Sequence, residues 1–92
     1  MVSLLLALTF AMLDPNTEIL VISEGCGPCV KAIRIIEDLQ DEGYDVVIVQ
    51  KKDCDYKIRA TPTLIIRERG KRPRYICGLQ TEEKYRELIT CI

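Results

Sequence analysis

The chain has 92 residues, of which 48% are hydrophobic and 29% are charged, and its formal net charge is −1. These values are ordinary for a globular fold, so we expect one domain that spans residues 1–92. A nearly neutral chain provides no field that would attract nucleic acid or an anionic membrane. The sequence lacks histidine, which excludes histidine-dependent catalysis, and its few aromatic residues provide no platform for base stacking.

The first thirteen residues are almost wholly apolar. This run is shorter than the roughly 20 residues of a membrane-spanning helix, and it has no Lys or Arg to form the positive end of a signal peptide. We therefore predict no membrane span. We predict instead an extra apolar N-terminal helix over residues 1–13, which packs on the sheet and ends at the turn-forming segment Asp14–Asn16. A docking face for a partner and a targeting segment are the alternatives.

Two continuous apolar runs, Ile19–Ile22 and Val46–Val49, are typical of strands that are covered on both faces. Between them, residues 27–40 have the periodicity of a half-buried helix, and Gly43 is suited to end it. The strand–helix–strand order predicts a parallel crossover. The apolar stripe of this helix contains Cys29, Ala32, Ile33, Ile36 and Leu39, and it is widened by Val30 and Ile35.

The second half of the chain is predicted to form a hairpin and a final helix. A short polar link, Lys51–Ala60, has room for one helical turn and leads to a strand at Thr63–Ile66. A charged turn at residues 68–73 then precedes a return strand that begins at Tyr75. Thr81 is a suitable N-cap for the last helix.

One close pair of cysteines, Cys26 and Cys29, stands between the first strand and the first helix of this core. The attacking species in thiol–disulfide exchange is the thiolate, and the backbone N–H groups at a helix N-terminus lower the pKa of a cysteine placed there. The second cysteine, about one turn further on, can then attack a mixed disulfide on the first. A strand, this pair and a helix in a small α/β chain predict redox chemistry.

The other cysteines bring the total to five, an odd count. Such a count does not match the disulfide framework of a small secreted protein, so we expect a reducing compartment and a cytoplasmic location. Cys54 and Cys77 could in principle complete a zinc site with the close pair, but their spacing does not form a second zinc knuckle. We expect no metal, and we interpret Cys54, Cys77 and Cys91 as small apolar residues.

Three features together resemble the thioredoxin/glutaredoxin superfamily: the Cys-Gly-Pro-Cys tetrapeptide at 26–29, Thr61-Pro62-Thr63, and Gly78 ahead of the final helix. The resemblance covers residues 17–92 and is most like that of a small glutaredoxin-like thioredoxin. It implies a thioredoxin-like α/β fold, in which a four-stranded mixed sheet is flanked by helices and the second helix of the fold is shortened or missing.

The resemblance also implies a thiol–disulfide oxidoreductase that reduces protein disulfides, with a cis peptide bond before Pro62. No cofactor is expected beyond the redox-active disulfide. The alternative is a non-enzymatic thioredoxin-like binding or assembly module that uses the apolar N-terminus and the basic hairpin tip. The expected site residues are the catalytic Cys26 and Cys29, the motif residues Gly27 and Pro28, and the substrate-binding residues Thr61, Pro62 and Gly78.

The expected partners are protein disulfides and a reductase, and we expect the protein to act as a monomer without nucleic acid. Glutaredoxins bind glutathione partly through polar or acidic side chains just after the glycine that precedes the last helix. Here Gly78 is followed by Leu79-Gln80-Thr81. We therefore expect a flavoprotein reductase rather than glutathione as the electron donor.

Overall fold

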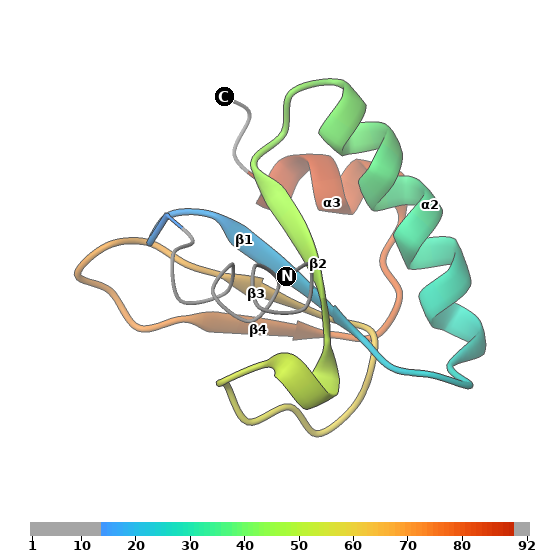
Figure 1. Ribbon diagram of the computed structural model, residues 1–92. Coiled ribbons are helices and arrows are strands. Elements are labelled where there is room, and N and C mark those ends of the chain that lie inside the picture. Colours follow the sequence, from blue (N-terminus) through green and yellow to red (C-terminus); the bar gives the residue numbers. More distant parts are fainter. Residues whose placement is uncertain (1–13, 90–92) are drawn as a thin grey trace, which may run out of the picture.

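The computed structural model describes residues 14–89 (Figure 1). The apolar helix expected over residues 1–13 lies outside this range. No helix of the described part has the length and apolar character needed to cross a membrane. The elements are β1 (Glu18–Ile22), α2 (Gly27–Asp41), β2 (Val46–Gln50), the short 3₁₀ turn η1 (Lys51–Asp53), β3 (Thr63–Ile66), β4 (Arg74–Cys77) and α3 (Glu82–Leu88).

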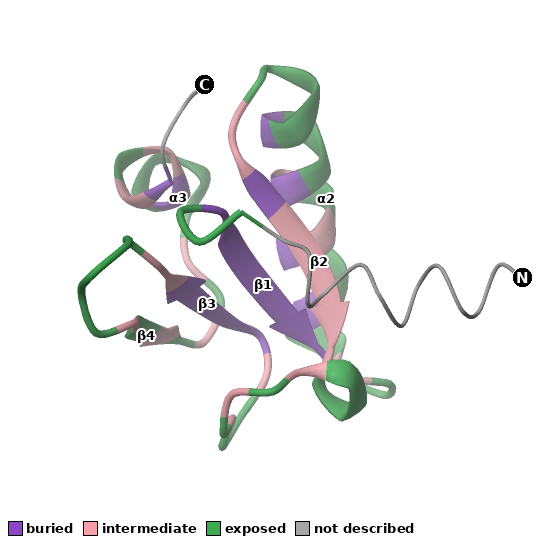
Figure 2. Cartoon of the chain, turned by 60° about the vertical axis from the view of Figure 1, so that its left-hand side comes forward, coloured by how far each residue is buried: buried purple, intermediate pink, exposed green. Residues whose placement is uncertain are grey.

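The strands form one four-stranded mixed sheet, as predicted, and their order in it is β2-β1-β3-β4. β1 pairs in parallel with β2, which is the crossover expected from the intervening helix, and it pairs antiparallel with β3. β3 and β4 form the predicted hairpin. The central strand β1 is buried along its whole length (Figure 2), because both of its faces and both of its edges are covered.

Both helices of the described chain lie on the same face of the sheet (Figure 1). Alternate residues of β1 and β3, Leu20 and Leu64, point toward them and are fully buried. A strand directs successive side chains to opposite faces, so this face receives every second residue of each strand. The main core cluster consists of Leu20, Ile22, Cys29, Ala32, Ile36, Leu39, Val46, Leu64, Tyr85 and Ile89.

The other face of the sheet is covered by irregular chain in place of a helix. Ile19, Val21 and Ile65 are fully buried there, and Cys54, Tyr56 and Ile58 from the segment after η1 pack against them. The predicted loss of the fold's second helix is thus confirmed, with three residues of 3₁₀ turn in its place. Within residues 14–89 no helix covers this face, because the polar link after β2 offers too few apolar positions for a packed helix.

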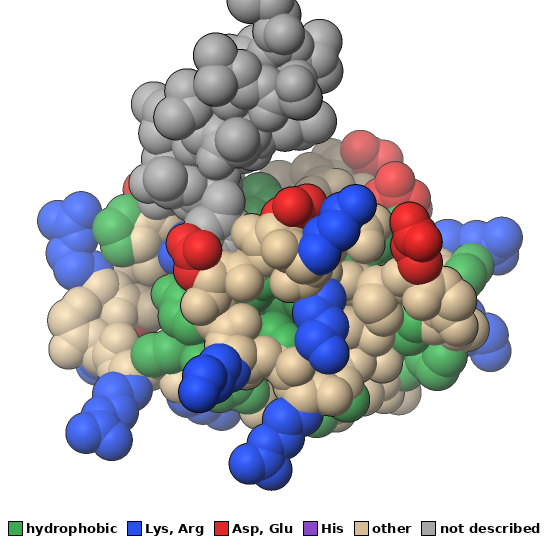
Figure 3. Space-filling model, turned by 60° about the horizontal axis from the view of Figure 1, so that its bottom comes forward, with side chains coloured by type: hydrophobic (Ala, Val, Ile, Leu, Met, Phe, Trp, Pro, Cys, Tyr) green, Lys and Arg blue, Asp and Glu red, His purple; other side chains and the backbone are tan. Residues whose placement is uncertain are grey.

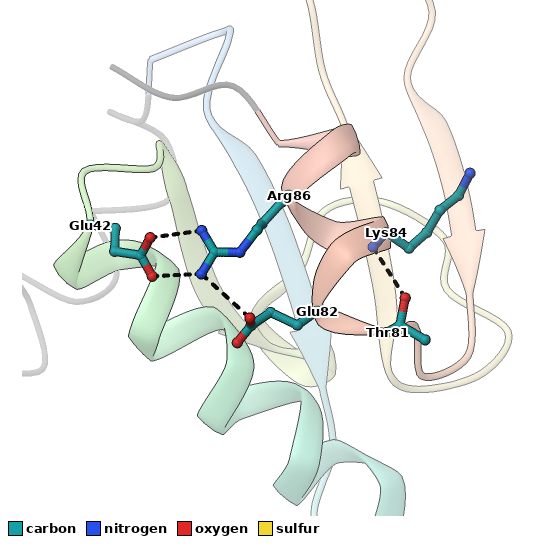
Figure 4. Close-up of polar contacts among 5 residues, drawn as sticks. All are labelled: Glu42, Thr81, Glu82, Lys84 and Arg86. Carbon is teal, nitrogen blue, oxygen red and sulfur yellow. Dashed lines mark hydrogen bonds and ion pairs between the residues drawn. The ribbon is translucent and has the colours of Figure 1, made fainter.

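The C-terminal end of α2 is joined to α3 by an ion pair (Figure 4). Glu42, which caps α2, accepts two hydrogen bonds from the Arg86 guanidinium at 2.7 and 2.8 Å. Arg86 also reaches Glu82 at 3.4 Å and lies over the Tyr44 ring. Thr81 caps α3 as predicted, since its side chain accepts the N–H of Lys84. The bonds between Glu42 and Arg86 therefore join the two helices on the face of the sheet that both cover.

Candidate active site

Cys26 and Cys29 form a disulfide at the N-terminus of α2, with their Cα atoms 5.3 Å apart. Cys26 is the N-cap of the helix, and its sulfur accepts the backbone N–H of Cys29 at 3.2 Å. Gly27 and Pro28 form the first helical turn. A proline is well suited to this turn because the N–H it lacks would have no partner within the helix. The pair therefore occupies the helix terminus that the sequence predicted.

The two sulfur positions differ in their access to solvent. Cys29 is 2% exposed and belongs to the main core cluster between α2 and the sheet. Cys26 is half-buried, while Gly27 and Pro28 beside it are exposed. Part of the Cys26 surface is covered by the chain around Thr61, whose carbonyl oxygen lies 3.4 Å from the Cys26 sulfur.

The loop that faces the disulfide contains the predicted cis peptide bond between Thr61 and Pro62. Pro62 is fully buried and Thr61 is half-buried. The hydroxyl groups of Ser23 and Thr61 are hydrogen-bonded at 2.5 Å, which ties this loop to the chain that leaves β1. The loop is held a second time at Thr63, whose hydroxyl donates to the carbonyl of Ala60 at 2.7 Å.

Gly78 is the third segment of the site, after the tetrapeptide and the Thr61 loop. Its backbone has a φ of +86°, a conformation that L side chains rarely adopt. This turn aims the Gly78 N–H at the Pro62 carbonyl, with an N···O distance of 2.8 Å. The structure therefore brings together all the residues that the sequence nominated: the tetrapeptide at 26–29, the loop at Thr61 and Pro62, and Gly78.

Sequence reasoning missed two residues of this site. Ser23 is hydrogen-bonded to Thr61 and so holds the Thr61 loop. The sequence could have indicated this role only through the position of its hydroxyl, between a buried strand and the tetrapeptide. Val30 was expected to widen the buried stripe of α2, but it is 52% exposed beside the disulfide. Leu79 is also exposed, at 39%. An apolar residue in the first turn of a helix that begins at a redox pair is therefore a candidate for substrate contact.

The remaining described cysteines, Cys54 and Cys77, form no disulfide. Burial raises the pKa of the half-buried Cys54 thiol above its ordinary value of 9.0, although the backbone N–H of Tyr56 acts in the opposite direction. Cys77 is exposed at the end of β4, where it pairs with Thr63. No group of three or more potential ligands that could hold a metal ion occurs among residues 14–89. Cys91 lies outside that range.

A disulfide at the start of a helix, facing a cis-proline loop on a four-stranded mixed sheet, defines a thioredoxin-like protein. No known family model matches the chain. The thioredoxins of Rickettsia prowazekii and Rickettsia typhi are 32% and 31% identical to it over 75 residues, which cover 73% of this chain and 71% of each relative. The thioredoxin of Listeria monocytogenes is 28% identical over 72 residues, 70% of either chain. The chain therefore belongs to the thioredoxin superfamily.

Proposed function

We propose that this protein is a dithiol–disulfide oxidoreductase that reduces disulfides in other proteins. The observation that carries the proposal is the unequal burial of a bonded cysteine pair. Cys26 can be reached from outside and Cys29 is enclosed in the core. A nucleophile must meet its substrate, whereas a resolving thiol needs to meet only the first sulfur.

The reaction begins from the reduced pair. The Cys26 thiolate attacks one sulfur of the substrate disulfide, so that a Cys26–substrate bond forms and the substrate's own S–S bond breaks. The departing substrate sulfur takes up a proton. Cys29 then loses its proton and attacks the Cys26 sulfur, which restores the intramolecular disulfide seen here and releases the second substrate thiol. Two electrons pass from the protein to the substrate in this cycle.

We propose that an extended segment of the substrate lies along Thr61, Pro62 and Gly78. These residues are hydrogen-bonded to one another or lie within 3.4 Å of the Cys26 sulfur, so a segment that docks on them is brought to the reacting atom. Val30 directly follows Cys29, Leu79 directly follows Gly78, and both side chains are exposed. They provide apolar contact that tolerates many sequences, since hydrophobic contact is not directional.

We propose further that a flavoprotein reductase, rather than glutathione, returns electrons to the disulfide. The polar groups after Gly78 are already used within the chain. The Gln80 side-chain amide donates to the carbonyls of Cys77 and Gly78 at 3.2 and 3.1 Å, and the Thr81 hydroxyl caps α3. These bonds leave only the Gln80 amide oxygen and the Thr81 hydroxyl proton for the charged amino-acid end of glutathione, and an unmatched polar group on a ligand costs affinity.

We also propose that the protein works as a monomer in a reducing compartment such as the cytoplasm. Cys54 and Cys77 are free thiols, and a reducing environment keeps such thiols from pairing with other molecules.

The test is the reduction of insulin disulfides by dithiothreitol with catalytic amounts of the protein. We expect the native chain to accelerate precipitation of the insulin B chain, and we expect Cys26→Ser to abolish the effect. Cys54→Ser is the matched control, because it removes a thiol outside the site. A native chain that shows no acceleration would refute the proposal and favour a non-enzymatic binding module.

A further inference from the structure

A pocket of about 220 Å³ opens next to the disulfide site on the face of the sheet opposite the helices. Its position follows from the strand register: Thr63 directly follows Pro62 and pairs with Cys77, which directly precedes Gly78. Thr63 also pairs with Val21, a residue of the sheet face opposite α2 and α3. The lining residues are Lys57, Ile58, Arg59, Thr63, Tyr75 and Cys77.

The charged residues that line this pocket are both basic. Lys57 and Arg59 are both exposed, neither forms an ion pair with another residue of the described chain, and no carboxylate is among the lining residues. Figure 3 brings forward the side of the molecule on which η1 lies, and Lys and Arg side chains project across it while Asp and Glu gather toward the upper rim. A pocket with two unpaired cations attracts an anionic group.

The rest of the pocket is less polar. Tyr75 is 44% exposed, and its ring contacts Tyr56 edge-on with centroids 6.3 Å apart. Ile58 is half-buried. Apolar walls beneath two cations suit a carboxylate that is carried on a short hydrocarbon stem, as in a glutamate side chain, because the stem and the charge both find complementary surface.

We propose that this pocket selects protein substrates with an acidic side chain close to the disulfide that is reduced. The inference rests on the proposed function, since it assigns the substrate class of the same site. Thr61 lies beside the Cys26 sulfur and the pocket begins at Thr63. An extended chain rises about 3.3 Å per residue, so the acidic residue stands two or three positions from the reacting cysteine.

The two cations are exposed, so their attraction for a substrate is screened by salt and modest in size. Charges at the rim of an interface act mainly on the rate of association. We therefore expect substrates with an acidic side chain to have a higher kcat/KM, in part because their KM is lower. We expect this preference to shrink as the salt concentration rises.

The test compares three disulfide-bonded peptides that differ at the second and third positions from one cysteine, where they carry Glu, Gln or Lys. We expect kcat/KM to be highest for the Glu peptide, lower for the Gln peptide and lowest for the Lys peptide. In the double variant Lys57→Gln/Arg59→Gln, we expect kcat/KM for the Glu peptide to fall roughly three- to tenfold. The control is Lys71→Gln/Arg72→Gln, which removes the same charges from the hairpin tip at the other end of β3. It should leave the order and the ratio unchanged.

A cysteine-free form of the Glu peptide separates this inference from the proposed function. We expect it to shift the backbone amide resonances of Lys57, Arg59 and Cys77 in the native protein but not in the double variant Lys57→Gln/Arg59→Gln. Such binding without turnover of any peptide would overturn the proposed function alone. Equal turnover of all three peptides, or an equal loss in both double variants, would overturn the acidic preference alone.

Discussion

The sulfur atoms of Cys26 and Cys29 experience different surroundings although they stand only three residues apart. Cys26 caps α2 and accepts a backbone N–H, and it faces the Thr61 loop at the surface. Cys29 points into the core, where it is 2% exposed. A helix terminus favours the thiolate of the first, whereas burial in apolar surroundings favours the neutral thiol of the second. One position is suited to attack and the other to resolution.

We therefore predict that, in the reduced protein, iodoacetamide labels Cys26 well before Cys29. We also predict that Cys29→Ser accumulates a mixed disulfide on Cys26, because no second thiol remains to release the substrate. Peptide mapping by mass spectrometry measures both outcomes. Cys77→Ser serves as the control, since it removes an exposed thiol outside the pair and should accumulate no such adduct. Earlier labelling of Cys29 would contradict the assignment.

Gly78 provides a second test at the scale of one residue. At its φ of +86° any added Cβ is strained, although no neighbouring atom lies within 4 Å of it. We predict that Gly78→Ala lowers the free energy of unfolding by about 1–2 kcal/mol. Gly27→Ala is the control, because a Cβ there also meets nothing within 4 Å but the residue begins a helix; it should be neutral or slightly stabilising. Chemical denaturation measures both, and equal losses would exclude a backbone origin.

Which residues could be predicted from the sequence depended on whether their role is local. The tetrapeptide, Pro62 and Gly78 each need a specific backbone or side-chain chemistry, and residue type alone reveals it. The exposure of Val30 and the hydrogen bond between the Ser23 and Thr61 hydroxyls depend on how separate segments meet. Hydrophobic periodicity is analysed within one helix at a time. It therefore assigns any apolar residue near the apolar stripe of that helix to the core.

At the scale of elements, the junction between α2 and α3 depends on charge as well as on the core. The hydrogen bonds from Arg86 hold the pKa of the Glu42 carboxyl below its ordinary value of 4.5, and those to Glu42 and Tyr44 raise the pKa of Arg86. A carboxyl whose pKa is lowered in the folded state stabilises that state above its ordinary pKa. This contribution is lost as the pH falls through the folded value.

We predict that Glu42→Gln lowers the melting temperature at pH 7, and that its difference from the native chain shrinks as the pH falls through the lowered pKa of Glu42. The effect is small, since the pair is at the surface, and added salt reduces it. Glu87→Gln is the control, because its one ion pair, with Lys84, is long at 3.9 Å. Thermal unfolding followed by circular dichroism measures the series. A difference that does not shrink as the pH is lowered would show that charge is not its origin.

The elements themselves were largely predictable because their apolar patterns are strong. The runs at β1 and β2 are continuous, and both strands form where expected. The way in which Cys54, Tyr56 and Ile58 cover the sheet face opposite α2 and α3 was not predictable in detail. Cys54, Tyr56 and Ile58 alternate with charged residues in a link of low regularity, and only the finished sheet gives those three side chains a surface on which to pack.

At the scale of the whole molecule, the proposed function raises the question of which electron donor docks at the site. Protein partners need an accessible sulfur with apolar surroundings, and Cys26 with Val30 and Leu79 provides these. Glutathione needs several polar groups that are free to bind its charged ends. After Gly78, the Gln80 amide and the Thr81 hydroxyl are bonded within the chain.

We predict that turnover coupled to a flavoprotein thioredoxin reductase exceeds turnover coupled to glutathione and glutathione reductase by about tenfold or more, because each polar group of glutathione that lacks a partner weakens binding. Both assays follow NADPH oxidation with the same protein disulfide as the final acceptor. The variant Gln80→Ala is the informative comparison, since it frees the carbonyls of Cys77 and Gly78 without adding a charge, and it should not raise the glutathione rate. A native chain that couples to glutathione as well as to the flavoprotein would show that the bonded groups after Gly78 do not decide the donor.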